Sequence, residues 1–218
     1  MENLFDAAEG GERREERLAE LARQVSVCTR CDLALSRTNT VFGTGDPHSP
    51  LMLIGEGPGE NEDATGLPFV GRAGKLLDDI LAAVELTRDQ VYITNIVKCR
   101  ASVEEDGRTR NRQPKMGEIK TCNPYLQAQI DAIKPEVILC LGGPSAKTFI
   151  DKDFRITKDR GKWYEIDGIK TMATFHPAYI LRQRGDDLQN TKRLVWKDVQ
   201  NVYAEYQKAM EERSSNGK

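Results

Sequence analysis

The chain has 218 residues, 39% of them hydrophobic, and a net charge of −2 at pH 7. This size suffices for one sizeable core, so we expect a single domain over residues 1–218, with flexible segments at 1–12 and 212–218. No apolar run approaches the roughly 18 residues that cross a membrane, and the acidic start of the chain lacks the order of a signal peptide. These features exclude a membrane-spanning class, and we expect a monomer in the cytoplasm.

The first predicted element is an amphipathic helix over residues 13–26, where apolar side chains recur at helical spacing. Beyond it, short apolar runs typical of buried strands are separated by helical patterns. The predicted strands are 51–54, 91–94, 137–141 and 171–175, and the predicted helices are 73–84, 116–133, 144–150 and 192–210.

Strands that alternate with helices predict βαβ units and a mostly parallel sheet. The expected fold class is therefore α/β, a three-layer sandwich in which helices cover both faces of a central four-stranded sheet. Ligands of such sheets bind beyond the carboxyl ends of the strands. The residues found there are Gly55 and Glu56, Asn95, Gly142 and Gly143, and His176. We expect them to meet at one edge of the sheet.

A glycine-rich loop, 55–59, follows the first strand. It matches neither the dinucleotide-binding pattern nor a P-loop, and Pro58 removes a backbone donor, so phosphate binding is disfavoured. Its small side-chain cover suits close contact with a planar ligand that carries carbonyl groups. In the next loop Phe69 lies between Pro68 and Gly71, where an exposed ring can stack on a base.

Asn95 and His176 are the strand-end side chains with the clearest chemical use. An Asn amide donates and accepts at once, which is what reading the edge of a base requires. The ordinary alternatives are a turn or helix cap for the Asn and a core residue bonded to backbone for the His. His176 is one of only two histidines and precedes Pro177, which favours a functional role.

Four of the five cysteines form a candidate ligand set. Cys28 and Cys31 are spaced as C-x-x-C, and Cys99 and Cys122 follow at a distance. In a reducing compartment such cysteines indicate a metal, cluster or redox site rather than disulfides. Zinc and an iron–sulphur cluster fit this spacing almost equally well. Cys140 lies in an apolar run and is interpreted as a small hydrophobic core residue.

Positive charge is concentrated in one segment. From Lys98 to Lys120, seven Lys and Arg residues stand against four Asp and Glu residues. A protein of small net charge can still present a basic face, because the local field decides the attraction. Most such excesses are solvated surface, so this one alone identifies no partner.

Read together, several segments resemble the family 4 uracil-DNA glycosylases from about Cys28 to Arg182. They are GEGPGENEDATGLPFVGRAG (55–74), TNIVKCR (94–100), the pair Asn111 and Arg112, CNPYL (122–126) and FHPAYILR (175–182). The resemblance implies a uracil-DNA glycosylase-like fold and a [4Fe–4S] cluster on Cys28, Cys31, Cys99 and Cys122. It implies a monofunctional enzyme of base excision repair that flips uracil out of single- or double-stranded DNA and hydrolyses its N-glycosidic bond, leaving an abasic site.

The resemblance also implies roles for single residues. Phe69 stacks on the uracil, Asn95 pairs with its N3–H and O4, and His176 faces O2, where negative charge develops. Backbone N–H groups of Glu56 and Gly57 share that charge. Glu56 is a candidate for positioning the water. Glu62 is a candidate for blocking the C5 methyl group of thymine.

The expected DNA contacts are Arg112 and, in the loop 176–182, Leu181 or Arg182 as a wedge or phosphate contact. The chain departs from the family pattern in two places. Segment 101–109 is longer than the family's proline-rich link, and Gly57 stands where the family commonly has Ala. Since Gly57 offers no side chain as a general base, we expect a dissociative, oxocarbenium-like path.

Two other classes of function stay open. A DNA-binding protein would recognise uracil and retain it, either inactive or covalently linked through a histidine. Related proteins of that kind carry a basic loop with a histidine, and the matching stretch 154–161 has none. A redox-sensing or assembly module would use the cluster as its active part. We favour the glycosylase, with the cluster as a structural staple.

Overall fold

The computed structural model describes the backbone of residues 4–216 and the side chains of residues 13–215. Within that range the main sheet has six strands in the order β1-β3-β2-β6-β8-β7. Their bounds are β1 Thr44–Gly45, β2 Leu51–Gly55, β3 Tyr92–Asn95, β6 Val137–Leu141, β7 Tyr164–Ile166 and β8 Ile169–Thr174. The four inner strands run parallel, and the edge strands β1 and β7 are antiparallel to their neighbours.

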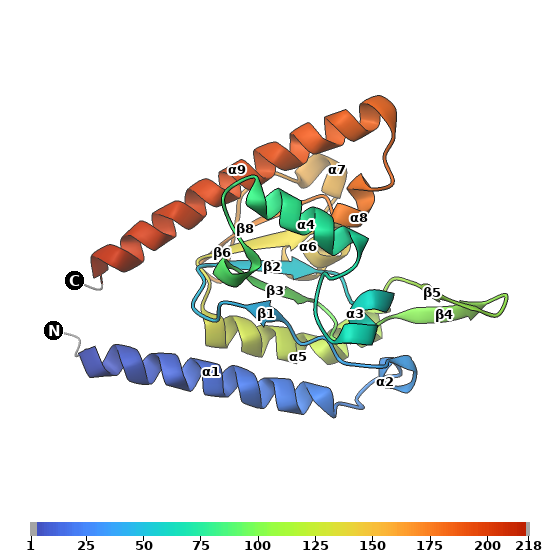
Figure 1. Ribbon diagram of the computed structural model, residues 1–218, viewed down its shortest axis with the longest axis horizontal. Helices are drawn as coiled ribbons and strands as arrows, with labels where there is room; N and C mark the ends of the chain where they lie inside the picture. The colour runs from blue at the N-terminus through green and yellow to red at the C-terminus, as the bar shows by residue number, and fades with distance from the viewer. Residues whose placement is uncertain (1–3, 217–218) are drawn as a thin grey trace.

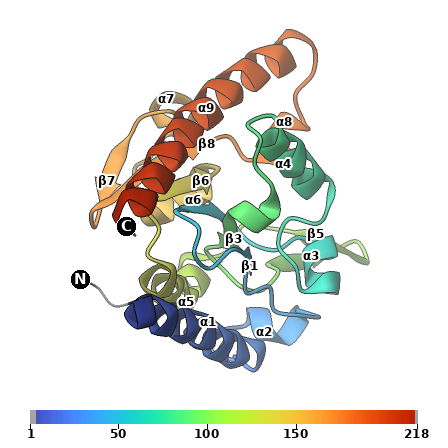
Figure 2. The ribbon, with the colours of Figure 1, turned by 60° about the vertical axis from the view of Figure 1, so that its left-hand side comes forward.

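Helices cover both faces of this sheet (Figures 1 and 2). One face carries α4 Arg72–Ala82, α8 Pro177–Ile180 and α9 Gly185–Asn216, and the other carries α1 Leu4–Ser26, α5 Met116–Ile133 and α6 Gly143–Phe149. The connections hold α2 Leu33–Ser36, α3 Glu60–Thr65, α7 Ile156–Asp159 and the 3-10 helix Arg88–Gln90. The predicted α/β class and three-layer arrangement are confirmed.

Successive strand residues contribute to two separate cores. Leu51 and Leu53 belong to the core beneath α4 and α9, while Met52 and Ile54 belong to the core beneath α1 and α5. Strand side chains point to opposite faces in turn, so a strand covered on both faces is apolar throughout. Cys140 of β6 is fully buried in the second core, as expected for a small hydrophobic residue.

The sheet is wider than the predicted four strands, because two short edge strands extend it. β1 has only two residues, too few for a recognisable pattern. β7 pairs with β8 across the turn Asp167–Gly168, where both residues have a positive φ, 50° and 80°. An Asp-Gly turn between apolar residues is a strong hairpin signal, so β7 was open to prediction.

The terminal helices are longer than predicted. α1 begins at Leu4, and α9 runs through to Asn216. Residues 1–3 and 217–218 lie outside the described residues, so the flexibility expected for 1–12 and 212–218 stays a prediction, as does the single domain. None of the helices in the described range is long and apolar enough to cross a membrane.

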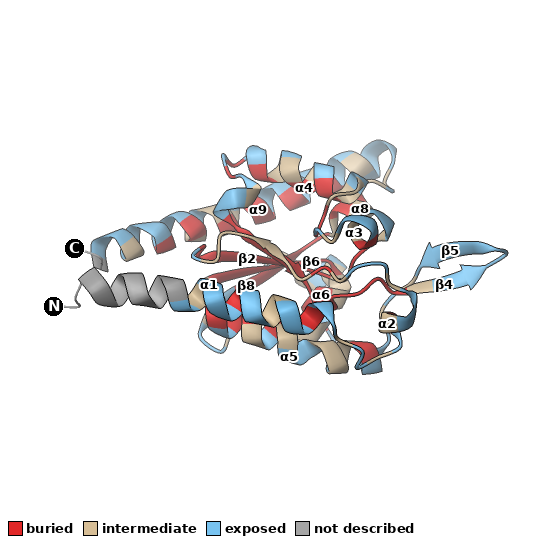
Figure 3. Ribbon diagram, turned by 60° about the horizontal axis from the view of Figure 1, so that its bottom comes forward, coloured by how far each residue is buried: buried red, intermediate tan, exposed pale blue. Residues whose placement is uncertain are grey.

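The long segment after Cys99 forms an exposed hairpin. Its strands, β4 Ser102–Glu105 and β5 Arg108–Asn111, pair only with each other. The hairpin projects from the body of the molecule at the end toward which the inner strands point (Figures 1 and 3). It therefore lies at the end of the molecule where a ligand of a parallel sheet is expected.

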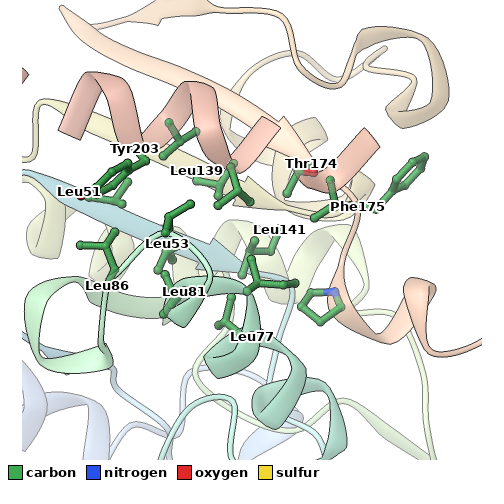
Figure 4. A pocket seen from close by; sticks show the side chains of 16 residues that line it. Leu51, Leu53, Leu77, Leu81, Leu86, Leu139, Leu141, Thr174, Phe175 and Tyr203 are labelled. Atoms are coloured by element: carbon green, nitrogen blue, oxygen red, sulfur yellow. The ribbon is translucent and has the colours of Figure 1, made fainter. Parts of the chain in front are cut away.

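An apolar cavity lies between the sheet and helices α4 and α9 (Figure 4). Leucines of β2, α4 and β6 line it together with apolar side chains of α9, and Thr174 and Tyr203 contribute the hydroxyl groups among the lining side chains. A site that reads a nucleobase needs several converging polar groups. This cavity is therefore part of the hydrophobic core and not the ligand site.

Candidate functional site

The carboxyl ends of the inner strands bring the predicted residues together. A Cβ built on Gly55, the last residue of β2, would lie 2.3 Å from Asn95 Oδ1 and 2.6 Å from Phe69 Cζ. One built on Gly142, after β6, would lie 3.1 Å from the Cβ of His176. The two glycines thus leave the space around which the Asn, Phe and His side chains are arranged.

Asn95 is the clearest sign of a ligand. Its side chain is buried at the end of β3, and its Oδ1 is the buried side-chain oxygen without a hydrogen-bond partner among the described residues. Leaving such an atom unpaired costs about 1–3 kcal/mol. The cost is explained if a ligand supplies the missing donor.

His176 presents one ring nitrogen to the same space. As N-cap of α8, its Nδ1 accepts a hydrogen bond from the backbone N–H of Ala178 at 3.0 Å. Burial and the nearby charge of Arg182 lower the pKa of His176 to about 4, against a smaller opposing effect of Glu62. The imidazole is therefore neutral at pH 7, and because Nδ1 accepts, the proton sits on Nε2 as a donor.

Phe69 is buried and not exposed as expected, because its ring packs into the core beneath α4, and its backbone has an unusual φ of 54°. Its ring stacks on that of His176 at 5.6 Å between centroids. Arg88, which the sequence analysis did not single out, donates to the carbonyls of Pro68 and Phe69. A Cβ on Gly74 would lie 1.7 Å from the Phe69 oxygen, so only glycine fits there. The loop that carries Phe69 is thus fixed from both sides.

Glu62 forms hydrogen bonds to backbone groups in two parts of the glycine-rich motif. Its Oε1 accepts from the N–H groups of Val70 and Gly71 at 2.9 and 2.8 Å, and its Oε2 accepts from Gly59 at 3.0 Å. The carboxylate joins the first loop to the loop of Phe69. Contact of Glu62 with a C5 methyl group stays a prediction.

Glu56 and Gly57 follow β2 directly. The Glu56 carboxylate forms no hydrogen bond or ion pair with the described side chains, and burial raises its pKa while Arg182 partly offsets this. A Cβ on Gly57 would lie 2.8 Å from Val97 Cγ2. Val97 thus occupies the space that a side chain at position 57 would need.

The predicted DNA contacts differ in exposure and in whether the side chain is already hydrogen-bonded within the protein. Leu181 is half-buried and Arg182 exposed directly after α8, close to the pocket. The Arg112 guanidinium forms two hydrogen bonds to Glu118, at 2.7 and 2.9 Å, and one to the Ser102 carbonyl at 3.1 Å. Arg112 is thus committed to the base of the hairpin, and its contact with DNA stays a prediction.

The four predicted ligand cysteines line one cavity between α1 and α5, which we call the cysteine cavity: Cys28, Cys31, Cys99 and Cys122. No three of the described His, Cys, Asp and Glu side chains are placed to hold a single metal ion. The four thiols thus border a common space.

Hydrogen-bond donors face two of these sulphur atoms. Arg37 Nη1 donates to Cys99 Sγ at 3.4 Å, and the backbone N–H of Lys98 donates to Cys122 Sγ at 3.3 Å. Burial raises the pKa of both thiols, that of Cys99 to about 11, and these donors offset the effect of burial only in part.

A cation–π pair, Arg30 on Tyr125, lies beside the cysteine cavity. The Arg30 guanidinium lies 4.2 Å from the ring centroid of Tyr125. Burial raises the pKa of the Cys28 thiol, but hydrogen bonds from Arg30 and Tyr125 outweigh burial and leave that pKa below its ordinary value. Cys28 thus differs from Cys99 and Cys122, because its surroundings favour the thiolate.

Lys98 is a second residue that the sequence analysis did not single out. It lies between the cysteine cavity and Asn95, and its side chain is fully buried. The sequence did contain a sign of this role, because Lys98 stands between the apolar residues Ile96 and Val97 and the candidate ligand Cys99. A polar residue inside an apolar run that leads into a site is a candidate for a buried contact.

In comparisons with known proteins, the family model and the relatives reported below all point to one superfamily. The sequence model of the uracil DNA glycosylase superfamily matches residues 42–200. A type-4 uracil-DNA glycosylase of Thermotoga maritima is 43% identical over 86% of this chain and 93% of its own length. Enzymes of the same name from Archaeoglobus fulgidus and Sulfurisphaera tokodaii are 40% and 45% identical over 76% and 75% of this chain, and over 84% and 76% of their own lengths.

Proposed function

The chain belongs to the uracil-DNA glycosylase superfamily and, within it, to the type-4 enzymes, and on this premise we propose how it removes uracil from DNA. It is a DNA repair enzyme that hydrolyses the N-glycosyl bond of uracil. The observation that carries the assignment of the site is the unpaired Oδ1 of Asn95, buried beside Phe69 and His176.

Asn95 selects the base. Its Oδ1 accepts from N3–H of uracil and its Nδ2 donates to O4, whereas cytosine presents an unprotonated N3 and an amino group at those positions. A site built to pair such groups strongly rejects a base that leaves them unpaired. Phe69 stacks on the face of the flipped base, a contact worth about 1–3 kcal/mol.

His176 stabilises the leaving group. As the glycosidic bond breaks, negative charge develops on O2 of uracil, and the neutral imidazole donates its Nε2–H there. The donor is fixed beforehand by the Nδ1 contact with Ala178, so it pays no reorganisation during the reaction. Backbone N–H groups of Glu56 and Gly57 share the charge. Each such donor is worth about 3–4 kcal/mol.

Water then attacks the oxocarbenium-like sugar, and Glu56 is the group we assign to orient it. Burial raises the pKa of this carboxyl, which makes it a better proton acceptor at neutral pH. The base must first leave the duplex, at a cost of a few kcal/mol. Leu181 and Arg182 are the proposed wedge and phosphate contact.

We further propose that Cys28, Cys31, Cys99 and Cys122 hold a [4Fe–4S] cluster. The donor set supports this, because four cysteines line one cavity, N–H donors face two of the sulphur atoms, and four thiolates suit an iron–sulphur cluster. When bound, the cluster supplies folding free energy and not chemistry. A brown colour and visible absorbance that follow iron content would support it; stoichiometric zinc would overturn it.

The activity is tested on an oligonucleotide with a single uracil. We expect strand cleavage only after alkali, because a monofunctional enzyme leaves an intact abasic strand. Asn95→Ala should lose at least about 100-fold in rate, as expected for a lost catalytic contact. Cleavage without alkali would overturn the monofunctional assignment. A denaturant-stable adduct with DNA would instead favour a protein that retains uracil. Monomeric state and cytoplasmic location stay predictions, checked by size-exclusion chromatography and cell fractionation.

A further inference from the structure

Lys98 has an unusual environment for a lysine. Its side chain is 1% exposed, and its Nζ donates to Thr94 Oγ1 at 2.6 Å, to the Asn95 carbonyl at 2.8 Å and to Gln129 Oε1 at 2.5 Å. An ammonium group has three donors, so its hydrogen-bonding capacity is filled. None of the described carboxylates forms an ion pair with Lys98.

The acceptors of Lys98 are themselves held in place. Gln129 of α5 donates to the Phe42 carbonyl at 3.0 Å and to the Tyr92 hydroxyl at 3.2 Å, and Thr94 donates to the same Phe42 carbonyl at 2.8 Å. These groups form one buried polar network beneath the end of β3. Burying a lysine amino group this deeply is costly even beside the Cys122 sulphur, whereas an apolar side chain would avoid that cost. The lysine therefore needs a reason beyond packing.

The reason lies in how Asn95 is oriented. Its Oδ1 has no partner in the protein, so no hydrogen bond at that atom fixes the amide before uracil arrives. Its orientation therefore depends on the side chains packed around it and on the backbone of residues 95 and 96. Two contacts fix that backbone: the N–H of Ile96 donates to the Gly55 carbonyl at 3.0 Å, and Lys98 Nζ donates to the Asn95 carbonyl.

The backbone of Lys98 is also held by hydrogen bonds. Its backbone N–H donates to Cys122 Sγ, and its carbonyl accepts from the N–H of Val41 at 2.8 Å. We propose that Lys98 is a positioning residue that holds Asn95 ready to read uracil, braced against the cysteine cavity. The inference rests on the proposed role of Asn95 and adds a residue that never touches the base.

A double-mutant cycle tests this role. Lys98→Met keeps the length of the side chain and removes its donors, and single-turnover rates of uracil release are compared for wild type, Lys98→Met, Asn95→Ala and the double variant. We expect Lys98→Met alone to lose about 100-fold, since a misplacement of about 1 Å has that effect. In the Asn95→Ala background the same change should lose less than about threefold, because residues that act through one another are not additive.

Ser49→Ala is the matched control. Ser49 is fully buried and its hydroxyl is hydrogen-bonded, but it precedes β2 at the end opposite to the pocket. It should lower the thermal unfolding midpoint and leave the rate unchanged. Additive losses in the cycle, or a folded Lys98→Met with the wild-type rate, would overturn the inference while the glycosylase function stands. Wild-type activity in Asn95→Ala would overturn the proposed site itself.

Iron content and circular dichroism are measured for every variant. A folded Lys98→Met that has lost its iron would assign Lys98 to the cysteine cavity and overturn its role in positioning Asn95. If Lys98→Met does not fold, Gln129→Met takes its place in the cycle. It removes one acceptor of the Lys98 ammonium and leaves the residues beside the cysteines intact, and it should show the same non-additivity with Asn95→Ala.

Discussion

Gly55 shows how a single absent side chain defines the pocket. A Cβ at this position would meet both Asn95 Oδ1 and Phe69 Cζ at less than 3 Å. Gly55→Ala should therefore displace the amide that reads the base or the ring that stacks on it. We expect a loss of about 100-fold in kcat/KM with a cooperative unfolding transition retained.

The control for that change is Gly117→Ala. A Cβ on Gly117, near the start of α5, would meet no atom within 4 Å. Its rate of uracil release should equal that of wild type. A Gly55→Ala enzyme with wild-type kcat/KM would show that the space between the Asn and Phe side chains is not where the base binds.

The ionisation of His176 makes a pH prediction. Its pKa in the folded protein is about 4, below the 6.5 of an exposed histidine, so the unfolded chain binds the extra proton first as pH falls. Stability is therefore complete above pH 6.5 and is lost as pH falls toward 4. Between pH 7 and pH 5 the loss through this residue is about 2 kcal/mol.

The measurement is urea unfolding at both pH values for wild type and His176→Asn. Asn also accepts from the Ala178 N–H but does not titrate, so the variant should lack this part of the loss. Over the same range we expect no fall of the wild-type kcat that depends on His176, because the imidazole is neutral throughout. A fall of kcat centred near pH 6.5 that disappears in the variant would contradict a neutral His176.

Among the elements, those with long apolar or amphipathic patterns were predictable and the short ones were not. The inner strands and α5 match their predicted ranges closely because each buries a regular face, and burial selects the pattern. β1 pairs through two residues that carry no pattern. The hairpin of β4 and β5 is polar and exposed, so its strands lack an apolar side to be recognised.

The cysteine cavity joins elements that are far apart in the chain. Cys28 follows α1, and Cys122 lies within α5, against which α1 packs. Cys28→Ser should remove the visible absorbance and destabilise the protein by more than about 4 kcal/mol, the range typical of a lost metal site. For a chain of this size that corresponds to a fall of about 8–16 °C in the unfolding midpoint.

Cys140→Ala serves as the comparison for that variant. Cys140 is buried in β6, in the core beneath α1 and α5, but it does not line the cysteine cavity. It should keep full iron content and activity. If Cys28→Ser also kept its iron and its unfolding midpoint, the structural role of the cluster would be wrong.

At the scale of the whole molecule, one buried ion pair connects α9 to the site end of the sheet. Asp198 of α9 accepts two hydrogen bonds from Arg160 and one from Thr174 of β8 at 2.6 Å. The Asp198 side chain is 1% exposed and that of Arg160 10%. Asp198→Ala leaves the guanidinium buried without its partner and should cost about 3–5 kcal/mol in urea unfolding.

An exposed pair provides the contrast. The side chains of Glu20 and Arg23 on α1 are 50% and 73% exposed, and solvent screens the attraction between charges of that kind. Glu20→Ala should therefore leave stability almost unchanged. Equal losses in the two variants would show that Asp198 contributes through general packing and not through its buried charge partner.

Four features could be predicted without coordinates: the α/β class, the parallel inner strands, the four cysteines and the strand ends that carry Asn95 and His176. These follow from local patterns, since periodicity and motif spacing are properties of neighbouring residues. The contacts between distant residues became visible in the folded chain: Arg88 with the Phe69 carbonyl, Glu62 with the loop of Phe69, and Lys98 between the cysteine cavity and Asn95. Such contacts join residues from different elements. The sequence around a buried donor or acceptor does not show which distant residue will be its hydrogen-bond partner.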